Sequence, residues 1–338
     1  MSNGYYESDD VAAHPLPPIR GQEGSLQRAY PSYVLITPAK NEAALIRGAL
    51  ESVIAQTVRP SRWIIVDDGS TDDTAVIVES YIVRYPFIGL VRVADVKKRE
   101  FSNKAAAFNA GLQALEDHDY SFIGNLDADI SLEPSYYESV LDTFGRDARL
   151  GIAGGRVYTT INNKFVCSDN TVDSVGGAVQ LFRRQCFEEI GGYRGLPYGG
   201  IDAAAEIIAR WKGWVVRKVA QNVYEHRQTG SAQRSTLAGR YRDGLKFHTL
   251  GYGSLFFACR CLFRLMDNPI CIGSALSLAG FAYARGRKYP ICIPKEAVAY
   301  LQSEQNKKLR DWFHRLPGMR YGWGMSDDEA KDKLSNPT

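Results

Sequence analysis

Two carboxylates follow an apolar run in the segment SFIGNLDADIS, residues 121–131. Asp127 and Asp129 are two positions apart, so in an extended chain both side chains point to the same side. Two negative charges this close repel each other unless a cation relieves the repulsion. Carboxylate and phosphate oxygens are the hard ligands that Mg²⁺ or Mn²⁺ prefers. The pair therefore predicts a divalent cation that holds a diphosphate, with a purely structural turn as the alternative.

The same spacing occurs at Asp117 and Asp119, in the segment EDHDY. This second pair ends a polar helical pattern, where a solvated turn is the simplest interpretation. Asp127 and Asp129 instead follow an apolar strand pattern, and ligands of parallel α/β sheets bind past the carboxyl ends of the strands. The context of the spacing, rather than the spacing itself, indicates a site at residues 127–129.

A second acidic segment, VDDGSTDDT, ends another strand pattern at residues 66–74. Gly69 can form a tight turn, and Ser70 or Thr71 can cap the helix that follows. Capping does not explain Asp67 and Asp68, which precede the turn. A carboxylate there can accept the N3–H of a uracil ring, so capping and nucleotide binding both remain open.

Three further segments carry side chains that could do chemistry. Lys104 falls in the first turn of an expected helix, where a cation is unfavourable, so it predicts a phosphate or aspartate partner; a surface lysine is the alternative. Asp202 follows a Gly-Gly pair and could act as a general base or simply cap its helix. Glu206 lies one turn later and is the rival base. His226 is a candidate ligand, although a lone loop histidine more often has no such role.

These residues need a scaffold that brings strand ends together. Apolar runs rich in β-formers alternate with helical patterns, which indicates a parallel sheet covered on both faces. The expected strands are residues 33–37, 62–66, 89–93, 120–126 and 151–158, and the expected helices are residues 41–56, 72–84, 103–116 and 134–144.

The pattern changes after residue 160. Residues 175–195 indicate a strand, a short helix and a glycine-rich loop, and residues 202–212 a helix followed by a strand. Residues 225–232 are expected to form a polar loop, and the chain beyond them is helical. We expect a tail over residues 1–28, a catalytic domain over 29–226, a helical extension over 227–318 and a flexible tail over 319–338. The catalytic domain divides into a nucleotide half, 32–130, and an acceptor half, 131–226.

Charge is distributed unevenly along the 338 residues. The chain carries a net charge of only +3, but residues 227–320 contain 16 Lys and Arg against 5 Asp and Glu. A basic, partly apolar region suggests an anionic membrane leaflet as a partner, with a solvated basic face as the alternative. The apolar stretch at residues 269–284 is shorter than the ~20 residues that cross a bilayer, so a core or interfacial helix fits it better than a span. A re-entrant hairpin with residues 251–265 remains open.

Six scattered cysteines form no Cys-x-x-Cys pair, which is typical of a reduced, intracellular chain without a zinc framework. The first residues have no apolar segment typical of a signal peptide. We therefore expect a cytoplasmic protein at the cytoplasmic face of the membrane, without a nucleic-acid partner.

In order and spacing, four segments resemble the family 2 inverting glycosyltransferases, which have a GT-A fold. The segments are VLITPAKNEAALIRGALESVIAQT, WIIVDDGSTDDT, NKAAAFNAGL and NLDADI. The C-terminal segments GGIDAAAE, HRQTGSA and LGYGSLF are similar to those of bacterial and archaeal transferases of surface-polysaccharide and glycolipid synthesis. The resemblance implies an α/β protein with a Rossmann-like, mostly parallel sheet flanked by helices, followed by a helical extension.

The resemblance also implies roles for individual residues. Asp68 would hold the base, Asp127 the ribose or sugar, and Asp129 the metal. Asp202 would be the base although Ile201 stands where the family usually has Glu, and His226 would be a further metal or diphosphate contact. The remaining nucleotide-sugar contacts would be Thr37, Pro38, Asn41, Glu42 and Lys104.

These features predict a metal-dependent enzyme that transfers one sugar from a nucleotide-diphospho-sugar, such as a UDP-sugar, to an acceptor hydroxyl. The cofactor would be Mn²⁺ or Mg²⁺, and the acceptor a glycan or a lipid-linked molecule. The chain lacks the Gln-x-x-Arg-Trp motif of the processive synthases, which favours single transfer. Two alternatives are a sugar-1-phosphate nucleotidylyltransferase, which would need a glycine-rich phosphate loop, and a non-catalytic nucleotide-sugar-binding protein.

Overall fold

The computed structural model describes residues 29–93, 102–161, 164–167, 173–227, 236–266 and 269–314. The expected tails at residues 1–28 and 319–338 lie outside the described residues. Contacts divide the chain into two units, residues 1–30 and residues 31–338, and the fold described below is that of the second unit.

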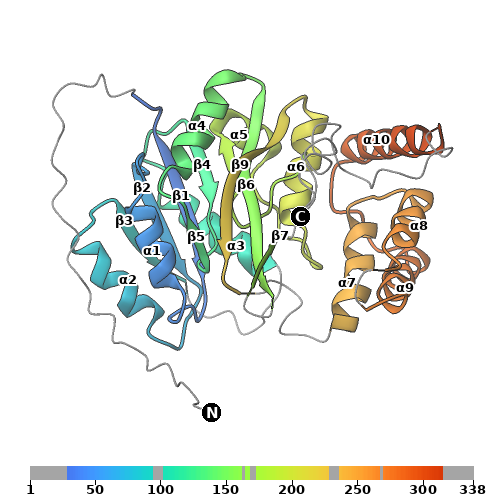
Figure 1. Cartoon of the computed structure of the whole chain (residues 1–338), viewed down its shortest axis with the longest axis horizontal. Coiled ribbons are helices and arrows are strands. Elements are labelled where there is room, and N and C mark those ends of the chain that lie inside the picture. The colour runs from blue at the N-terminus through green and yellow to red at the C-terminus, as the bar shows by residue number, and fades with distance from the viewer. Residues whose placement is uncertain are drawn as a thin grey trace, which may run out of the picture. The chain divides into compact units, whose positions relative to one another are not determined.

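The first half of the sheet is parallel, with strand order β3-β2-β1-β4 (Figure 1). The central strand β1 is entirely apolar up to Thr37 and buried, as expected for a strand covered on both faces. The elements of this first half of the sheet and its helices are β1 (Tyr33–Ala39), α1 (Ile46–Ile54), β2 (Arg62–Asp67), α2 (Thr74–Ile82), β3 (Ile88–Arg92), α3 (Ser102–Gln113) and β4 (Phe122–Asn125).

The second half of the sheet mixes directions. Strand β8 pairs antiparallel with β4 and with β6, β6 pairs parallel with β9, and β5 pairs antiparallel with β9. The elements of this second half of the sheet and its helices are β5 (Ile130–Leu132), α4 (Tyr136–Arg146), β6 (Leu150–Ile161), β7 (Lys164–Cys167), β8 (Leu181–Arg183), α5 (Arg184–Ile190), α6 (Ile201–Trp211) and β9 (Val215–Glu225). The short strand β5 begins directly after Asp129, so the residues of interest lie between two strands rather than at the start of a loop.

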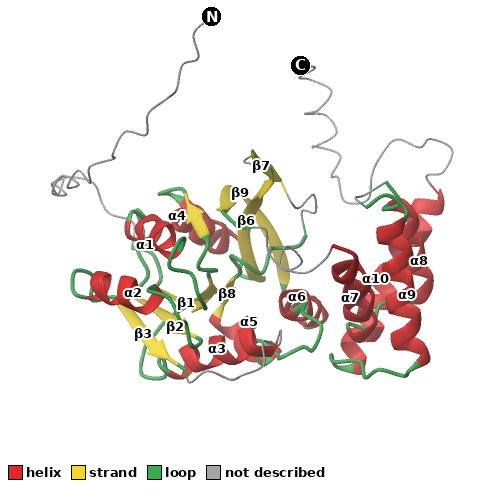
Figure 2. Cartoon of the chain, turned by 90° about the horizontal axis from the view of Figure 1, so that it is seen from below, coloured by secondary structure: helices red, strands yellow, loops and turns green. Residues whose placement is uncertain are grey.

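Helices cover both faces of this sheet, with α1 and α4 on one face and α3, α5 and α6 on the other (Figure 2). One buried cluster joins β1 and β2 to α3, α5 and α6; it includes Ile36, Val66, Phe108, Phe187 and Ile208. Helix α3 lies so close to the sheet that a Cβ on Gly111 would come within 2.7 Å of Ile36. The expected doubly covered α/β sheet is confirmed.

Four helices complete the described chain: α7 (Thr236–Thr249), α8 (Ser254–Phe263), α9 (Ile272–Gly286) and α10 (Lys295–His314). Helices α7 and α9 touch through their backbones, because a Cβ on Gly244 would lie 2.0 Å from the Ser277 carbonyl oxygen and one on Gly280 would lie 2.1 Å from that of Tyr241. Helix α10 contacts α6, and Ala297 and Leu301 belong to the same buried cluster as the sheet. Among the described helices, none combines the length and the apolar character that a membrane crossing requires.

Candidate functional site

The carboxyl ends of β1 and β2 are joined by a network of side-chain to backbone hydrogen bonds. Asn41 adopts a left-handed conformation, with φ of 55°, that turns its side chain back toward the loop after β2. Its carboxamide oxygen accepts the Thr71 backbone N–H at 2.8 Å, and its own N–H donates to the Ser70 hydroxyl at 3.0 Å. The VDDGSTDDT segment is therefore held against the first strand end. The expected capping of α2 by Ser70 or Thr71 is not observed: the N-cap residue is Asp73, which makes no side-chain capping hydrogen bond, and Ser70 and Thr71 bond to Asn41 instead.

Within this loop the acidic residues divide by role. Asp67 is buried and accepts the Ser70 N–H at 2.9 Å, which closes the turn at Gly69, whose φ is 68°. Asp72 accepts the backbone N–H groups of Ala43 and Thr74. Asp68 is half-buried, and its N–H donates to the Ala39 carbonyl oxygen at 2.9 Å, which fixes it at the strand end.

The expected contacts on β1 lie beside this loop. Thr37 is fully buried, and its hydroxyl accepts the Trp63 indole N–H at 2.9 Å, so its side chain faces the interior of the sheet. Pro38 is half-buried and lies opposite Val66 of β2. What Thr37 can offer a ligand at this edge is therefore its backbone.

Glu42 connects the first strand end to the end of β9. Its carboxylate makes a two-point ion pair with Arg227, with contacts of 2.8 and 2.7 Å. Burial raises the pKa of Glu42 despite this partner, and the charges of Asp127 and Asp72 act in the same direction as burial. Sequence reasoning placed Arg227 in a polar loop and gave it no role.

Asp127 has a cation of its own. Lys104 reaches from the first turn of α3 and contacts both carboxylate oxygens of Asp127, at 2.6 and 2.9 Å. Burial disfavours the charged ammonium, yet the pKa of Lys104 is raised because Asp127, Asp202 and Asp129 all face it. Asn125 adds a hydrogen bond to Asp127 at 2.9 Å. The aspartate partner expected for Lys104 from its place in the helix is present.

Asp129 lies among carboxylates. It is buried, and burial raises its pKa to about 7, with the charges of Asp127, Glu225 and Glu42 acting in the same direction. Glu225, expected in a loop, is instead the buried last residue of β9, paired across the ladder with Ile130. Because β5 and β9 pair here, Glu225 is brought beside Asp129, which the sequence alone did not reveal.

The acidic residues fit a divalent cation in one respect. Asp129 and its neighbours supply hard oxygen ligands and an excess of negative charge. Within the described residues, no three His, Cys, Asp or Glu side chains are gathered as a ready metal cluster. Oxygen ligands of this kind suit Mg²⁺ or Mn²⁺, which is typically bound through one or two carboxylates together with water and substrate phosphates.

His226 is exposed and adjoins this group. Its ring nitrogen Nε2 lies 2.8 Å from the Ser131 hydroxyl, and its backbone N–H donates to the Asp129 carbonyl oxygen at 3.0 Å. Its ring also meets the edge of Phe165, with ring centres 5.7 Å apart. His226 directly follows Glu225, the last residue of β9 and the pairing partner of Ile130, so its imidazole lies next to Asp129 where β5 and β9 meet.

Asp202 lies in the first turn of α6, after Gly200 with φ of 87°. Its side chain rests against the backbone of Gly177, where an added Cβ would lie 2.9 Å from the Asp202 Oδ2 atom. The Gly177 carbonyl oxygen in turn accepts the Asn125 amide at 2.6 Å. Gly177 therefore lets the α6 carboxylate approach the Lys104–Asp127 pair.

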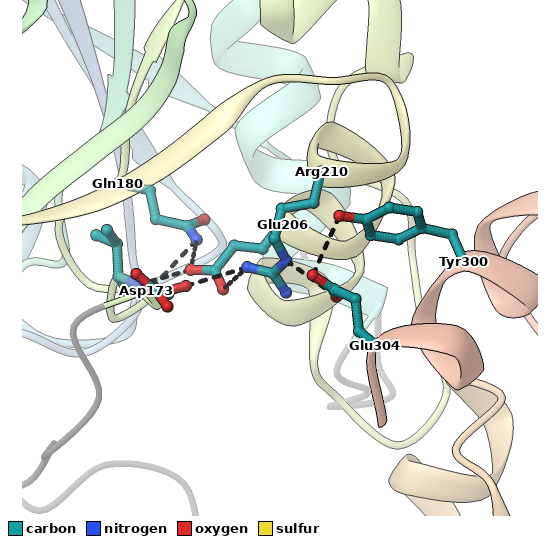
Figure 3. A network of polar contacts seen from close by, with 7 residues as sticks. Asp173, Gln180, Glu206, Arg210, Tyr300 and Glu304 are labelled. Carbon is teal, nitrogen blue, oxygen red and sulfur yellow. Dashed lines mark hydrogen bonds and ion pairs between the residues drawn. The ribbon is translucent and has the colours of Figure 1, made fainter. Parts of the chain in front are cut away.

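The rival carboxylate, Glu206, belongs to a buried network of hydrogen bonds and ion pairs (Figure 3). It is buried and accepts the Val175 N–H at 2.6 Å and the Gln180 amide at 3.2 Å. Burial raises the pKa of Glu206 to about 7, although the nearby Arg210 charge lowers it. Arg210 also contacts Glu304 of α10 at 3.7 Å, so this network connects α6 to the C-terminal helices.

The second Asp-x-Asp pair lies elsewhere. Asp119 is fully exposed, and its carboxylate forms an ion pair with Arg184 at 3.7 Å. The residues that sequence reasoning missed are Asn125, Gly177, Glu225 and Arg227. Only Asn125, a polar residue inside an apolar strand, carried a signal that could have been recognised; it is 2% exposed.

Comparison with known proteins finds similarity over the first part of the chain. Residues 34–189 match the family model described as Glycosyl transferase family 2. Over 141 residues, 42% of the chain, it is 31% identical to a chondroitin synthase of Escherichia coli. Over 144 residues it is 31% identical to the minor teichoic acid biosynthesis protein GgaA of Bacillus subtilis. These matches span only 19% and 31% of the lengths of the two relatives.

A solved structure with a similar fold is the mannosyltransferase PcManGT from Pyrobaculum calidifontis in complex with GDP-Man and Mn²⁺. The TM-score is 0.51 at 19% identity, over 84% of this chain and 83% of the other. At this level of identity the likeness establishes the fold, and the GT-A architecture expected from the sequence is confirmed.

Proposed function

We propose that this chain, whose residues 34–189 belong to glycosyltransferase family 2, is an inverting, metal-dependent glycosyltransferase. It transfers a single sugar from a nucleotide-diphospho-sugar to an acceptor hydroxyl. The observation that carries the proposal is the convergence of Asp127, Asp129 and Asp202 around Lys104 at the carboxyl edge of the parallel strands. Open α/β sheets bind nucleotides at this edge.

The donor half of the site is assigned to the strand ends. Asp68 contacts the base, while the backbone of Thr37 and Pro38 and the Asn41–Glu42 turn line the nucleotide. The GDP-Man complex of PcManGT supports a nucleotide-sugar donor, and a UDP-sugar is our preferred candidate. Asp127 contacts the ribose or sugar, and Lys104 keeps that carboxylate oriented through its two contacts.

Asp129 and His226 are the residues that would hold Mn²⁺ or Mg²⁺, together with the donor diphosphate. When bound, such a cation neutralises charge that develops on the leaving diphosphate. The Mn²⁺ in the PcManGT complex and the carboxylates around Asp129 support this assignment. Glu225 adds to the negative charge that would favour the cation.

Asp202 is assigned as the general base. Its carboxylate takes the proton of the acceptor hydroxyl while the acceptor oxygen forms a bond to the anomeric carbon. The bond from that carbon to the diphosphate oxygen breaks on the opposite face, so the nucleoside diphosphate leaves and the configuration inverts. Glu206 is less suited to this role, because its Oε1 atom already accepts hydrogen bonds from Val175 and Gln180 and its Oε2 atom contacts Arg210 at 3.5 Å.

A lipid-linked acceptor at the cytoplasmic face of a membrane is part of the same proposal. Its support is the basic C-terminal region, which holds 16 Lys and Arg against 5 Asp and Glu over residues 227–320. The relatives named for chondroitin and teichoic acid synthesis point to polysaccharide or related polymers as the pathway class.

The test begins with a thermal-shift panel of nucleotide-sugars in the presence of Mn²⁺. A true donor at 100 times its Kd raises the free energy of unfolding by roughly 2.7 kcal/mol. Transfer or donor hydrolysis is then measured for Asp202→Asn and, as a matched control, Glu206→Gln. We expect Asp202→Asn to lower kcat by about 10²–10⁴ with donor binding nearly intact.

Two results would contradict the proposal. Absence of binding to every nucleotide-sugar would remove the donor assignment. Full activity in Asp202→Asn, with the loss in Glu206→Gln instead, would move the base one turn along α6.

A further inference from the structure

A second charged site lies in the helical extension, outside residues 34–189. Helices α7, α8 and α9 enclose a small cavity of about 30 Å³, lined by Arg240, Arg260, Arg264, Ser274 and Ser277 among others. This volume admits a group the size of one or two oxygen atoms rather than a sugar ring or a base. A ligand would therefore insert only a small polar group and remain outside with the rest of its structure.

The charges around the cavity are mostly positive. Arg240 comes from α7, and Arg260 and Arg264 come from α8 and its C-cap position, so two helices place three arginines in the lining of one cavity. The carboxylate in the lining, Asp243, is paired with Lys246 at 2.8 Å. Burial lowers the pKa of Arg260 and the nearby Arg264 charge acts in the same direction, while Tyr252 and Asp243 act against it. An anion would relieve both effects.

The architecture keeps this arrangement fixed. Arg240 lies one turn before Gly244, where the backbones of α7 and α9 touch. The Ser277 hydroxyl donates to the Arg240 carbonyl oxygen at 3.0 Å, and the Arg240 Nε atom lies 3.3 Å from where a Cβ on Gly273 would be. The arginine is thus held at the first turn of α9, whose amino end carries a partial positive charge.

Exposed apolar side chains surround the same end of the helices. Of the thirteen large apolar side chains exposed in the described residues, five lie between residues 262 and 272, at the connection of α8 to α9. They are Leu262, Phe263, Met266, Ile270 and Ile272, with exposed fractions of 60%, 46%, 81%, 56% and 55%. We call these five residues the α8–α9 tip. Asp267 and Asn268, within the same connection, lie outside the described residues.

We propose that the α8–α9 tip docks on an anionic phospholipid membrane, with a lipid phosphate at Arg240, Arg260 and Arg264. Neither feature alone selects this partner. An arginine cluster on its own could bind free phosphate, and apolar side chains on their own could bind a second copy of the chain. A lipid headgroup region offers both a phosphate and an apolar layer within a few ångströms, and the protein presents arginines and apolar side chains at one helix end.

This inference rests on the proposed function in one respect: membrane docking is useful to the enzyme if its acceptor is lipid-linked. Docking would bring the site to such an acceptor without a spanning helix. Binding to vesicles needs neither donor nor acceptor, so the docking experiment can fail while transfer to a soluble acceptor succeeds, and the reverse.

The experiment is co-sedimentation of the full chain with vesicles of phosphatidylcholine alone and of phosphatidylcholine mixed with phosphatidylglycerol. We expect binding only to the anionic vesicles, weakening as salt shortens the range of electrostatic attraction to about 8 Å at physiological ionic strength. Met266→Ser with Ile270→Ser should weaken binding at least about tenfold, because two apolar side chains no longer enter the lipid. Arg260→Gln with Arg264→Gln should weaken it and flatten its dependence on salt.

Matched controls distinguish binding through the α8–α9 tip and its arginines from non-specific electrostatic or hydrophobic binding elsewhere on the protein. Val76→Ser with Val83→Ser removes two exposed apolar side chains of the catalytic domain, and Arg285→Gln with Arg287→Gln removes two charges at the other end of α9. Both should leave vesicle binding within about twofold of the unchanged protein, since neither pair touches the tip. Melting temperatures of all variants establish that each one is folded.

Three results would overturn the proposal. The first is equal loss of binding in the tip variants and their controls. The second is stabilisation by inorganic phosphate with no binding to either vesicle, which would make the cavity a site for soluble phosphate. The third is a dimer in solution that Met266→Ser with Ile270→Ser dissociates while vesicles are ignored, which would make the tip a contact between copies.

Discussion

At the scale of single residues, the site balances several carboxylates against few cations. Lys104 neutralises Asp127, and Arg227 neutralises Glu42. Asp129 and Glu225 are buried beside these pairs, and the pKa of Asp129 is raised to about 7, first by burial and then by its acidic neighbours. A carboxylate in such surroundings is stabilised by a further cation, which is why the metal is assigned to Asp129 rather than to Asp127.

The first prediction follows from this assignment. Asp129→Ala should abolish transfer and should weaken donor binding only when Mn²⁺ or Mg²⁺ is present, because the lost carboxylate acts through the metal. Calorimetric titration of the donor with and without metal measures the effect. Asp119→Ala is the control, since Asp119 has the same sequence spacing but is fully exposed. If the two variants behave alike, the site has been placed wrongly.

The second prediction concerns Glu206 and pH. Burial raises the pKa of Glu206 from 4.5 to about 7, so between these values the folded protein holds a proton that the unfolded chain has released. Stability therefore decreases as pH rises from about 4.5 to 7, by an amount on the order of 3 kcal/mol at most. Glu206→Gln cannot titrate, and it should remove this part of the slope.

The measurement is the free energy of unfolding by denaturant from pH 5 to 8, without metal. Glu188→Gln serves as the control, because Glu188 is exposed and forms an ion pair with Arg184 on its own helix. An unchanged slope in Glu206→Gln would mean that the carboxylate is ionised throughout this range.

At the scale of elements, the sequence predicted the parts of the site that depend on strand ends. The apolar runs of β1, β2 and β4 and the polar residues after them are enough to place Asp68, Asp127 and Asn41 at one edge. Pairing between distant strands was not predictable in the same way. Strand β5 has only three residues, and Glu225 reaches Asp129 because β5 pairs with β9, nearly one hundred positions along the chain.

Close backbone contacts were equally impossible to predict from the sequence. Gly177 lies in a glycine pair that the sequence offered only as part of a strand, yet its missing side chain is what admits Asp202. The contact between α7 and α9 likewise depends on two glycines that resemble ordinary weak points of a helix. Such contacts depend on which elements meet, and local propensity carries no information about that.

The third prediction tests the glycine contact. Gly244→Ala or Gly280→Ala should destabilise the protein, because each added Cβ would come within about 2 Å of a backbone atom of the other helix. Backbone cannot yield as a flexible side chain does, so we expect a loss of about 1–3 kcal/mol, the range for overpacking. Gly48→Ala, on an exposed helical position with nothing within 4 Å, should instead stabilise by about 0.5–1 kcal/mol. Denaturant unfolding of the three variants measures both directions.

At the scale of the whole second unit, one buried cluster extends from the sheet into the C-terminal helices. Leu250, Ile293, Ala297 and Leu301 share it with Ile36 and Val66 of the central strands. The Arg210 side chain adds a polar connection, contacting both Glu206 of α6 and Glu304 of α10 (Figure 3). The helix that carries Asp202 is therefore packed on one side by the sheet and on the other by α10.

This continuity predicts that the catalytic fold and the helical extension unfold together. Leu301→Ala leaves a cavity where α10 meets the shared cluster, so it should lower the free energy of unfolding by about 2–5 kcal/mol and shift every probe of unfolding equally. Leu255→Ala is the control, because Leu255 is 65% exposed and its loss should change stability by at most about 0.5 kcal/mol. The measurement follows fluorescence of Trp63 in β2, in a background where the other four tryptophans (Trp211, Trp214, Trp312 and Trp323) are replaced by Phe, and far-ultraviolet circular dichroism in the same titration. If the catalytic fold and the helical extension unfolded independently, Leu301→Ala would shift the helical signal alone and leave the Trp63 signal unchanged. Packing of α10 on α6 would then not contribute to holding Asp202 in place.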